Sequence, residues 1–304
     1  MLTIAISVLI KNFDQELNAI SNQIKNLSEQ INFDSKNTIN ILYVIQTTLN
    51  VEFNEIESKI KSCNYGLKIN CIYGGLGGVA NSRNIAINFA QTKYLLFFDL
   101  DCRFKCSIQP LLNHLKDETY EYIYFANKEN YSGDQISLLP RMNITFLNRF
   151  GILGTYFFWL IAIVKSPTYN IIVNPKYCRS KKIFFDTNLG LGSHYKQSDE
   201  ALFMIDLFKS FYKNKRLKKS FFLAENLYAV SKSHINKKDF AIALQSKGYV
   251  ARKAFNKNYL ILLILGLIFA CKYYKKYNPF RIFLEITKGF LAPKEKNDKL
   301  NKLQ

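Results

Sequence analysis

The sequence predicts an α/β protein in which helices cover both faces of a parallel sheet. Three observations lead to this prediction: apolar runs alternate with helical stretches, the fourth apolar run ends in two acids, and the chain is long enough for a packed core. Its 304 residues are 48% hydrophobic and 15% aromatic, which excludes a disordered chain. Strands that alternate with helices are typical of a parallel sheet.

The predicted elements follow one another regularly in the first third of the chain. Apolar runs predict strands at 2–10, 39–45, 68–73 and 94–98, and the stretches between them predict helices at 14–30, 52–63 and 79–90. The middle of the chain is less regular, with predicted strands at 120–126 and 154–164, a polar loop at 127–135 and a helix at 198–212. The basic region from residue 234 onward is helical in character.

Basic residues outnumber acidic ones by a wide margin. The chain has 42 Lys and Arg against 23 Asp and Glu, a formal net charge of +19. Such an excess attracts polyanions: nucleic acid, an anionic membrane surface or substrates with phosphates. Basic clusters at 209–219, 232–238 and 272–276 lie in the last third, near an apolar segment, which favours a membrane surface. No nucleic-acid-binding module is recognisable, so nucleic acid is not an expected partner.

The apolar segment at 259–271 is shorter than the roughly 20 residues that span a bilayer. A buried helix and a helix in the membrane interface both fit it, and we expect peripheral attachment rather than a span. Residues 1–10 lack the basic start and the cleavage site of a signal peptide and read as a first strand. The six cysteines are scattered, which suggests reduced thiols in a cytoplasmic protein.

Three signals for chemistry follow one another along the chain. The first is a glycine-rich turn that ends in Gly77 and Gly78 and opens the predicted helix at 79–90. Glycine lets a backbone approach a ligand closely, and a helix N-terminus offers unpaired amides to an anion. Arg83 lies one turn inside this helix, where its guanidinium can reach the same anion.

The second signal is the pair Asp99 and Asp101 at the end of the fourth apolar run. Side chains alternate along a strand, so both acids are predicted to point one way while Leu100 points back. Two like charges at the end of a buried strand suit a divalent cation with oxygen ligands. Ligands collect at the carboxyl ends of parallel strands, so we expect the glycine turn and the acid pair at one edge of the sheet.

The third signal combines a Gly-Leu-Gly turn at 190–192 with Asp199 and Glu200 in the first turn of the helix at 198–212. Ser198 is a natural N-cap, and acids in a first turn complement the helix dipole. Helix capping is therefore one explanation of this pattern. The other is that one of the acids is a general base placed opposite the cation.

In this order the signals resemble glycosyltransferase family 2. The resemblance rests on the Gly-x-Ala-x-x-Arg-Asn helix start from Gly78 to Asn84, the Asp-x-Asp strand end, and the downstream Gly-x-Gly turn with its acid pair, and it covers roughly residues 2–230. It implies inverting enzymes of the GT-A fold, a Rossmann-like mixed sheet flanked by helices. The stretch at 248–253 is similar to the tail of bacterial members that build capsule or lipopolysaccharide glycans.

The resemblance implies a role for each matching residue. Asp99 is expected to contact the ribose or sugar of the donor, and Asp101 to hold Mg²⁺ or Mn²⁺ against its diphosphate. Glu200 is the expected base, with Asp199 as its neighbour. His234 stands where some GT-A enzymes supply a further metal ligand. The remaining donor-binding residues expected from the helix start are Gly78, Arg83 and Asn84.

The chain departs from the family pattern at the end of its second strand. Family members usually carry an acid there that recognises the nucleobase, whereas this chain has Gln46. A glutamine amide can hydrogen-bond a uracil edge, and the expected donor is a UDP-sugar, but the missing acid leaves the base of the donor open. The expected acceptor is a glycan or a lipid-linked sugar in bacterial surface polysaccharide synthesis.

Two other functions stay open. A nucleotidyltransferase that forms nucleotide-sugars uses a similar sheet but would carry a glycine-rich phosphate loop after its first strand, where residues 10–13 have no glycine. A non-catalytic relative that binds a membrane or another polyanion has no need of Asp99, Asp101 and Glu200 together. The sequence therefore favours a metal-dependent, hexosyltransferase-type glycosyltransferase.

The predicted domain organisation follows from these assignments. Residues 1–230 form a catalytic domain, with the nucleotide-sugar half at 1–105 and the acceptor half at 106–230. Residues 231–304 form a basic, partly apolar helical region that associates with a membrane. We expect the protein in the cytoplasm, peripheral on the inner face of the cytoplasmic membrane, with a nucleotide-sugar, an acceptor and an anionic membrane surface as partners.

Overall fold

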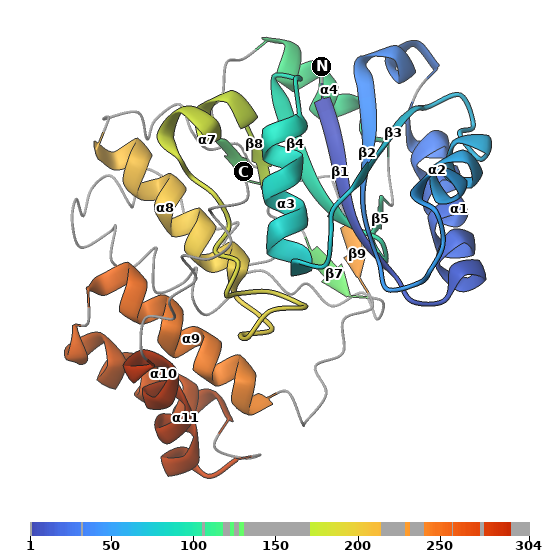
Figure 1. The fold of residues 1–304 in the computed structure, drawn as a ribbon. Coiled ribbons are helices and arrows are strands. Elements are labelled where there is room, and N and C mark those ends of the chain that lie inside the picture. The colour runs from blue at the N-terminus through green and yellow to red at the C-terminus, as the bar shows by residue number, and fades with distance from the viewer. Residues whose placement is uncertain are drawn as a thin grey trace.

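The computed structural model describes residues 2–31, 33–104, 107–117, 122–124, 128–130, 171–213, 229–231, 240–256, 258–273 and 277–292. A central sheet separates two layers of helices, and three C-terminal helices lie together at one end of the molecule (Figure 1). The predicted strand at 154–164 and His234 lie outside the described residues.

The central sheet has six strands in the order β3-β2-β1-β4-β8-β6. The strands are β1 (Leu2–Ile10), β2 (Ile39–Thr47), β3 (Lys68–Tyr73), β4 (Tyr94–Asp99), β6 (Tyr122–Tyr124) and β8 (Ile171–Val173). The first four run parallel, as predicted, whereas β8 runs antiparallel to β4 and β6 antiparallel to β8. The sheet is therefore mixed, with its parallel part formed by the regular first third of the chain.

Alternating side chains divide the core between the two faces of this sheet. On one face Ile4, Ile41 and Phe98 pack with α1 (Phe13–Gln30), α2 (Phe53–Ser62) and α4 (Gln109–Asp117). On the other face Ala5, Leu42 and Phe97 pack with α3 (Gly78–Phe89), α7 (Pro175–Lys181) and α8 (Asp199–Lys213). A short 3-10 helix, η1 (Phe33–Thr38), leads into β2. Residues that alternate along one strand thus supply two separate cores.

A second, smaller sheet of three short strands has the order β5-β9-β7. Its strands are β5 (Arg103–Phe104), β7 (Lys128–Asn130) and β9 (Ala229–Ser231). The prediction of a loop over 127–135 is wrong for residues 128–130, because they pair with β9 in parallel. A three-residue strand of polar side chains carries no hydrophobic alternation by which it could be recognised.

The C-terminal region forms α9 (Phe240–Phe255), α10 (Tyr259–Tyr273) and α11 (Pro279–Leu291). Val250, Leu265 and Ile286 from these helices belong to the same buried cluster as Phe97 of β4 and Phe203 of α8. The helices therefore share a hydrophobic core with the α/β part of the chain. Among the described helices, none has the length and apolarity that crossing a bilayer requires.

Candidate active site

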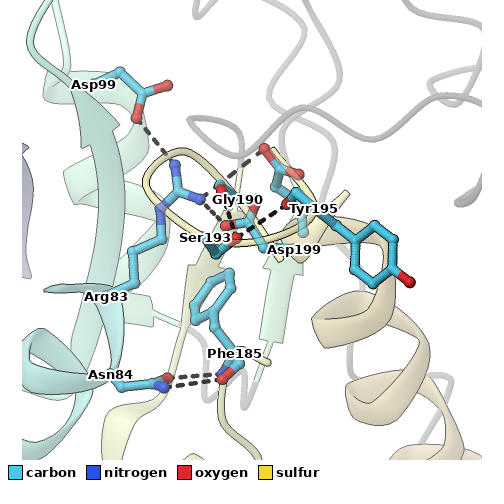
Figure 2. A network of polar contacts seen from close by, with 9 residues as sticks. Arg83, Asn84, Asp99, Phe185, Gly190, Ser193, Tyr195 and Asp199 are labelled. Atoms are coloured by element: carbon cyan, nitrogen blue, oxygen red, sulfur yellow. Dashed lines mark hydrogen bonds and ion pairs between the residues drawn. The ribbon is translucent and has the colours of Figure 1, made fainter. Parts of the chain in front are cut away.

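Three segments that are distant in the sequence meet at the carboxyl edge of the sheet. They are the end of β4 at Asp99, the first turns of α3 with Arg83, and the start of α8 with Asp199 and Glu200. Figure 2 shows the Arg83 side chain extended between Asp99 on one side and Asp199 on the other. The structure thus brings together four of the residues singled out in the sequence.

The Arg83 guanidinium is the centre of this arrangement. Its Nη2 donates to Asp99 Oδ1 over 3.1 Å, its Nη1 donates to Asp199 Oδ2, and the same Nη1 lies 4.0 Å from Glu200 Oε1. The side chains of Arg83 and Asp199 are almost completely buried. Burial on its own would lower the pKa of Arg83, but the carboxylates of Asp199, Asp99 and Glu200 raise it above its usual range. Arg83 is therefore a permanent cation that links both acid-bearing segments.

Two glycines let the loop before α8 lie directly on the start of α3. Gly78 has φ +76° and Gly192 has φ +87°, both in the left-handed region that favours glycine. A Cβ on Gly78 would lie 2.8 Å from Leu191 O, and a Cβ on Gly192 would lie 2.8 Å from Gly78 Cα. Val79 N donates to Leu191 O over 2.9 Å and closes this contact. In the structure Gly78 therefore joins two backbones, and its expected role in donor binding stays a prediction.

The amide of Asn84 holds a second part of the same loop. Its Nδ2 donates to Phe185 O over 2.9 Å, and Phe185 N donates to its Oδ1 over 2.7 Å (Figure 2). The Phe185 ring stacks on Phe203 of α8 with centroids 4.0 Å apart and lies 5.5 Å from the Arg83 guanidinium carbon. Asn84 thus positions the loop beside Arg83, which the sequence did not indicate, and its predicted contact with the donor stays a prediction.

The two acids of the Asp-x-Asp pair approach each other through a turn rather than through strand alternation. β4 ends at Asp99, and Leu100 and Asp101 form a turn closed by a hydrogen bond of 3.0 Å from Cys102 N to Asp99 O. The expectation that both acids lie on one face of a strand is therefore wrong, because Asp101 lies in the turn after β4. One side-chain oxygen each of Asp99 and Asp101 and the Sγ of Cys102 lie within 4.8 Å of one another.

Mg²⁺ and Mn²⁺ both fit the chemistry of this group. Asp101 is exposed and Asp99 is half-exposed, so their carboxylates can reach a ligand outside the chain. Carboxylate oxygens are the ligands that both cations prefer in proteins. The described residues offer two such groups here, and a diphosphate can supply the further oxygens that a divalent cation requires.

Asp199 and Glu200 begin α8 but differ in their surroundings. The Asp199 residue is 2% exposed, whereas the Glu200 side chain keeps 18% exposure. Burial and the neighbouring Glu200 carboxyl raise the pKa of Asp199, and Arg83 opposes this only in part. The buried acid therefore holds a proton to a higher pH than an ordinary aspartate, and Glu200 is the acid that solvent can reach.

The prediction that Ser198 caps α8 is wrong. Its φ is +73°, outside the extended range of an ordinary N-cap, and its buried Oγ has no hydrogen-bond partner among the described residues. Leu202 N reaches the backbone oxygen of Ser198 instead, over 3.5 Å. Capping by Ser198 therefore does not explain the third signal.

Gln46, the residue expected to read the nucleobase, lies at the end of β2 and is 5% exposed. Its Nε2 donates to Gly78 O over 3.3 Å, so it also supports the first turn of α3. A contact with the donor base stays a prediction for Gln46. The metal-ligand role of His234 also stays a prediction, because this residue lies outside the described ranges.

One polar network near the site has no counterpart in the predictions from sequence. Asp186 Oδ2 accepts from the Tyr249 hydroxyl over 3.1 Å and from Lys253 Nζ, both on α9. Asn188 Nδ2 donates to Asp186 Oδ1 over 3.1 Å and to the Tyr249 hydroxyl over 3.2 Å. The network ties α9 to the segment that leads into Asp199. No local motif indicated it, because its two halves, 186–188 and 249–253, lie about 60 residues apart.

Comparison with known proteins agrees with this geometry. Residues 7–172, more than half of the chain, match the model of "Glycosyl transferase family 2". This segment contains the end of β1, all of β2 to β4, the Arg83 helix and the Asp-x-Asp turn. No curated protein matches the chain.

Solved structures with a similar fold have low sequence identity to this chain. S. aureus TarS has a TM-score of 0.51 at 15% identity, covering 84% of this chain but only 40% of TarS. TarS 1–349 in complex with UDP-GlcNAc has a TM-score of 0.53 at 12% identity, over 84% of this chain and 67% of that one. The mannosyltransferase PcManGT from Pyrobaculum calidifontis, in complex with GDP-Man and Mn²⁺, has a TM-score of 0.50 at 10% identity, over 96% and 70%. At these identities the likeness shows the fold.

Proposed function

This chain belongs to glycosyl transferase family 2, and on that premise we propose that it moves a sugar from a nucleotide-sugar to a glycan or lipid-linked acceptor with inversion at the anomeric carbon. The observation that carries the proposal is the bridge made by Arg83. It joins the Asp-x-Asp turn, where we propose that the donor binds, to the acid pair of α8, where we propose that the acceptor is activated.

On the donor side, Asp101 with Asp99 would hold Mg²⁺ or Mn²⁺, in keeping with their exposed carboxylate oxygens. When bound, the cation supplies positive charge to the diphosphate that leaves. The first turn of α3 lies at the same edge, with Gly78 and Gln46 at its start, and its amides other than that of Val79 would face the diphosphate. A contact of Gln46 with uracil would make the donor a UDP-sugar.

On the acceptor side, Glu200 is the proposed general base. It retains exposure, whereas Asp199 is buried and its oxygen is bonded to Arg83. Glu200 would take the proton of the acceptor hydroxyl while the acceptor oxygen bonds to the anomeric carbon and the bond to the diphosphate oxygen breaks. Attack from the face opposite the leaving group inverts the configuration.

Arg83 and Asn84 are proposed as positioning residues. Arg83 bonds to Asp99 and Asp199 at once, so it offsets part of their negative charge and fixes the two halves of the site relative to each other. Asn84 fixes the Phe185 backbone next to it. Preorganised groups of this kind need not rearrange when charge develops in the transition state.

We further propose the setting in which the enzyme acts. The catalytic unit at 1–230 would comprise a nucleotide-sugar half at 1–105 and an acceptor half at 106–230, with residues 231–304 as its membrane-associating extension. The reaction would serve bacterial surface polysaccharide synthesis on the cytoplasmic face of the membrane. The basic excess of the chain and the half-exposed helix α10 support this setting.

A donor panel tests the proposal. Nucleoside diphosphate release would be measured for UDP-sugars and GDP-sugars, beginning with UDP-GlcNAc and GDP-Man, with Mn²⁺, with Mg²⁺ and with a chelator. We expect release from one donor class, loss of release with the chelator, and loss in Asp101→Ala. Release that is unchanged by the chelator and by Asp101→Ala would contradict the donor site. A product with the donor's anomeric configuration would contradict inversion.

A further inference from the structure

Helix α10 has an apolar face that the described residues leave uncovered. Leu260, Leu263 and Leu267 recur at intervals of three and four residues and so share one side of the helix. Leu263 is 49% exposed and Leu267 is 58% exposed, whereas Leu265 and Phe269 on the opposite side are buried in the core. A helix that is apolar all round is normally buried all round. The sequence left open whether the apolar segment 259–271 is buried or lies at a membrane interface. In the structure one side of α10 lies in the core and the other side is exposed.

Helix α11 continues this face. Phe280, Leu284 and Leu291 share one side of α11, and Phe280 is 74% exposed. The two helices run antiparallel, because the Tyr259 ring at the start of α10 lies 5.6 Å from the Phe290 ring at the end of α11. At the crossing, Phe283 lies against Gly266, where a larger residue would collide with its ring.

The exposed sides of α10 and α11 lie on either side of the contact between Gly266 and Phe283, and both face away from the buried core. Together they form the outer hairpin face, made up of Leu260, Leu263, Leu267, Phe280, Leu284 and Leu291. A large exposed apolar patch rimmed by polar residues marks an interaction surface. All six side chains of this face are apolar, so their exposure to water is unfavourable.

The charges around the outer hairpin face are basic. Arg281 and Lys288 are exposed. Arg281 follows Phe280 directly, and Lys288, which also pairs with Glu285, lies one turn after Leu284 on α11. Residues 240–304 contain thirteen Lys and Arg against three Asp and Glu. An apolar face with a basic border complements an anionic bilayer, in which acyl chains receive the apolar side chains and phosphate headgroups the cations. A second copy of this chain would bring like charges together.

We propose that the outer hairpin face docks α10 and α11 in the plane of an anionic membrane surface. The proposal rests on the proposed function, because a membrane surface is where a lipid-linked acceptor is found. The hairpin is joined to the site through α9, whose Tyr249 and Lys253 bond to Asp186 in the segment before Glu200. Docking therefore brings the acceptor side of the active site close to the lipid headgroups.

Vesicle binding of the full chain tests this surface. The double substitution Leu263→Glu with Leu267→Glu places two acids on the outer hairpin face without filling or emptying the core. The matched control is Tyr65→Glu with Phe89→Glu, which changes two apolar side chains of similar exposure, 49% and 50%, elsewhere on the molecule. Sedimentation would use vesicles of phosphatidylcholine alone and of phosphatidylcholine mixed with equal parts of phosphatidylglycerol, with thermal unfolding to verify the fold.

We expect the wild type and the control to bind the phosphatidylglycerol vesicles. The Leu263/Leu267 variant should bind them at least about tenfold more weakly. Binding should be weak on phosphatidylcholine alone and should fall with added salt.

Equal binding by all three proteins, or no binding by the wild type, would overturn the proposal. A wild-type dimer in analytical ultracentrifugation that the Leu263/Leu267 variant abolishes would assign the face to a second copy instead. Donor turnover separates this test from the proposed function: normal vesicle binding by a protein that releases no nucleoside diphosphate would refute only the latter.

Discussion

The guanidinium of Arg83 and the carboxylate of Asp199 form a buried ion pair between parts of the chain that lie 116 residues apart. The same guanidinium donates to Asp99 at the end of β4. One side chain therefore sets the distance between the strand end and the start of α8. Since Asp199 precedes Glu200 directly, this bridge also positions the proposed base.

Replacement of Arg83 by Met should destabilise the fold as well as the site. Where Asp199 is ionised, this change leaves its buried carboxylate without a cation, and the loss of one partner from a buried pair typically costs about 3–5 kcal/mol. Because burial raises the pKa of Asp199 to about 8, we expect a fall of that size in the free energy of unfolding in urea denaturation above that pH, and a smaller fall below it. Lys59→Met is the control, because Lys59 forms an exposed pair with Glu55 that should contribute about 1 kcal/mol or less. Similar losses in both variants would contradict a buried, structural Arg83.

The pH dependence of turnover should depend on Asp199. Burial and Glu200 raise its pKa, so the acid pair keeps a proton to a higher pH than an ordinary carboxyl. As the Asp199 proton leaves with rising pH, the new negative charge beside Glu200 should help this base to attract the acceptor proton, so kcat should rise. Asp199→Asn keeps an oxygen for Arg83 but has no such proton to lose, so this rise in kcat should be absent from the variant. The same rise in Asp199→Asn would show that another group causes it.

The link between α9 and the loop before α8 should affect turnover more than donor binding. Lys253→Met removes one of the two α9 donors to Asp186 and should loosen the segment that leads to Glu200. We expect kcat with a water-soluble acceptor to fall by about fivefold, which corresponds to about 1 kcal/mol, the typical net contribution of one hydrogen bond, with an unchanged KM for the donor. Lys288→Met is the matched control, because Lys288 bonds to Glu285 within α11. Equal effects of the two substitutions on kcat would contradict a positioning role for α9.

The first four strands could be predicted because their signal is local. Runs such as residues 39–45 and 94–98 are apolar almost throughout, and strands buried on both faces are typical of a parallel sheet. Their helices followed from the stretches between them, and the observed ends differ by only one or two residues. β7 and β9 could not be found in this way, because strands of three residues are defined by their partners.

The sequence predicted which residues form the candidate site, but not how they contact one another. Asp99 and Asp101 were expected on one strand face, whereas a turn after Asp99 brings them together. Ser198 looked like an N-cap by residue type, but its left-handed backbone removes the hydroxyl from that role. The bonds from Asn84 to Phe185 and from Lys253 to Asp186 join residues 101 and 67 positions apart, which no local pattern encodes.

We propose that Glu200 removes the proton of the acceptor in this glycosyltransferase. The most direct test is acceptor-dependent release of nucleoside diphosphate by Glu200→Gln, which keeps the size of the side chain but cannot accept that proton. We predict a loss in kcat of at least about a hundredfold, with donor binding and the free energy of unfolding close to those of the wild type. Wild-type turnover by Glu200→Gln would contradict this account.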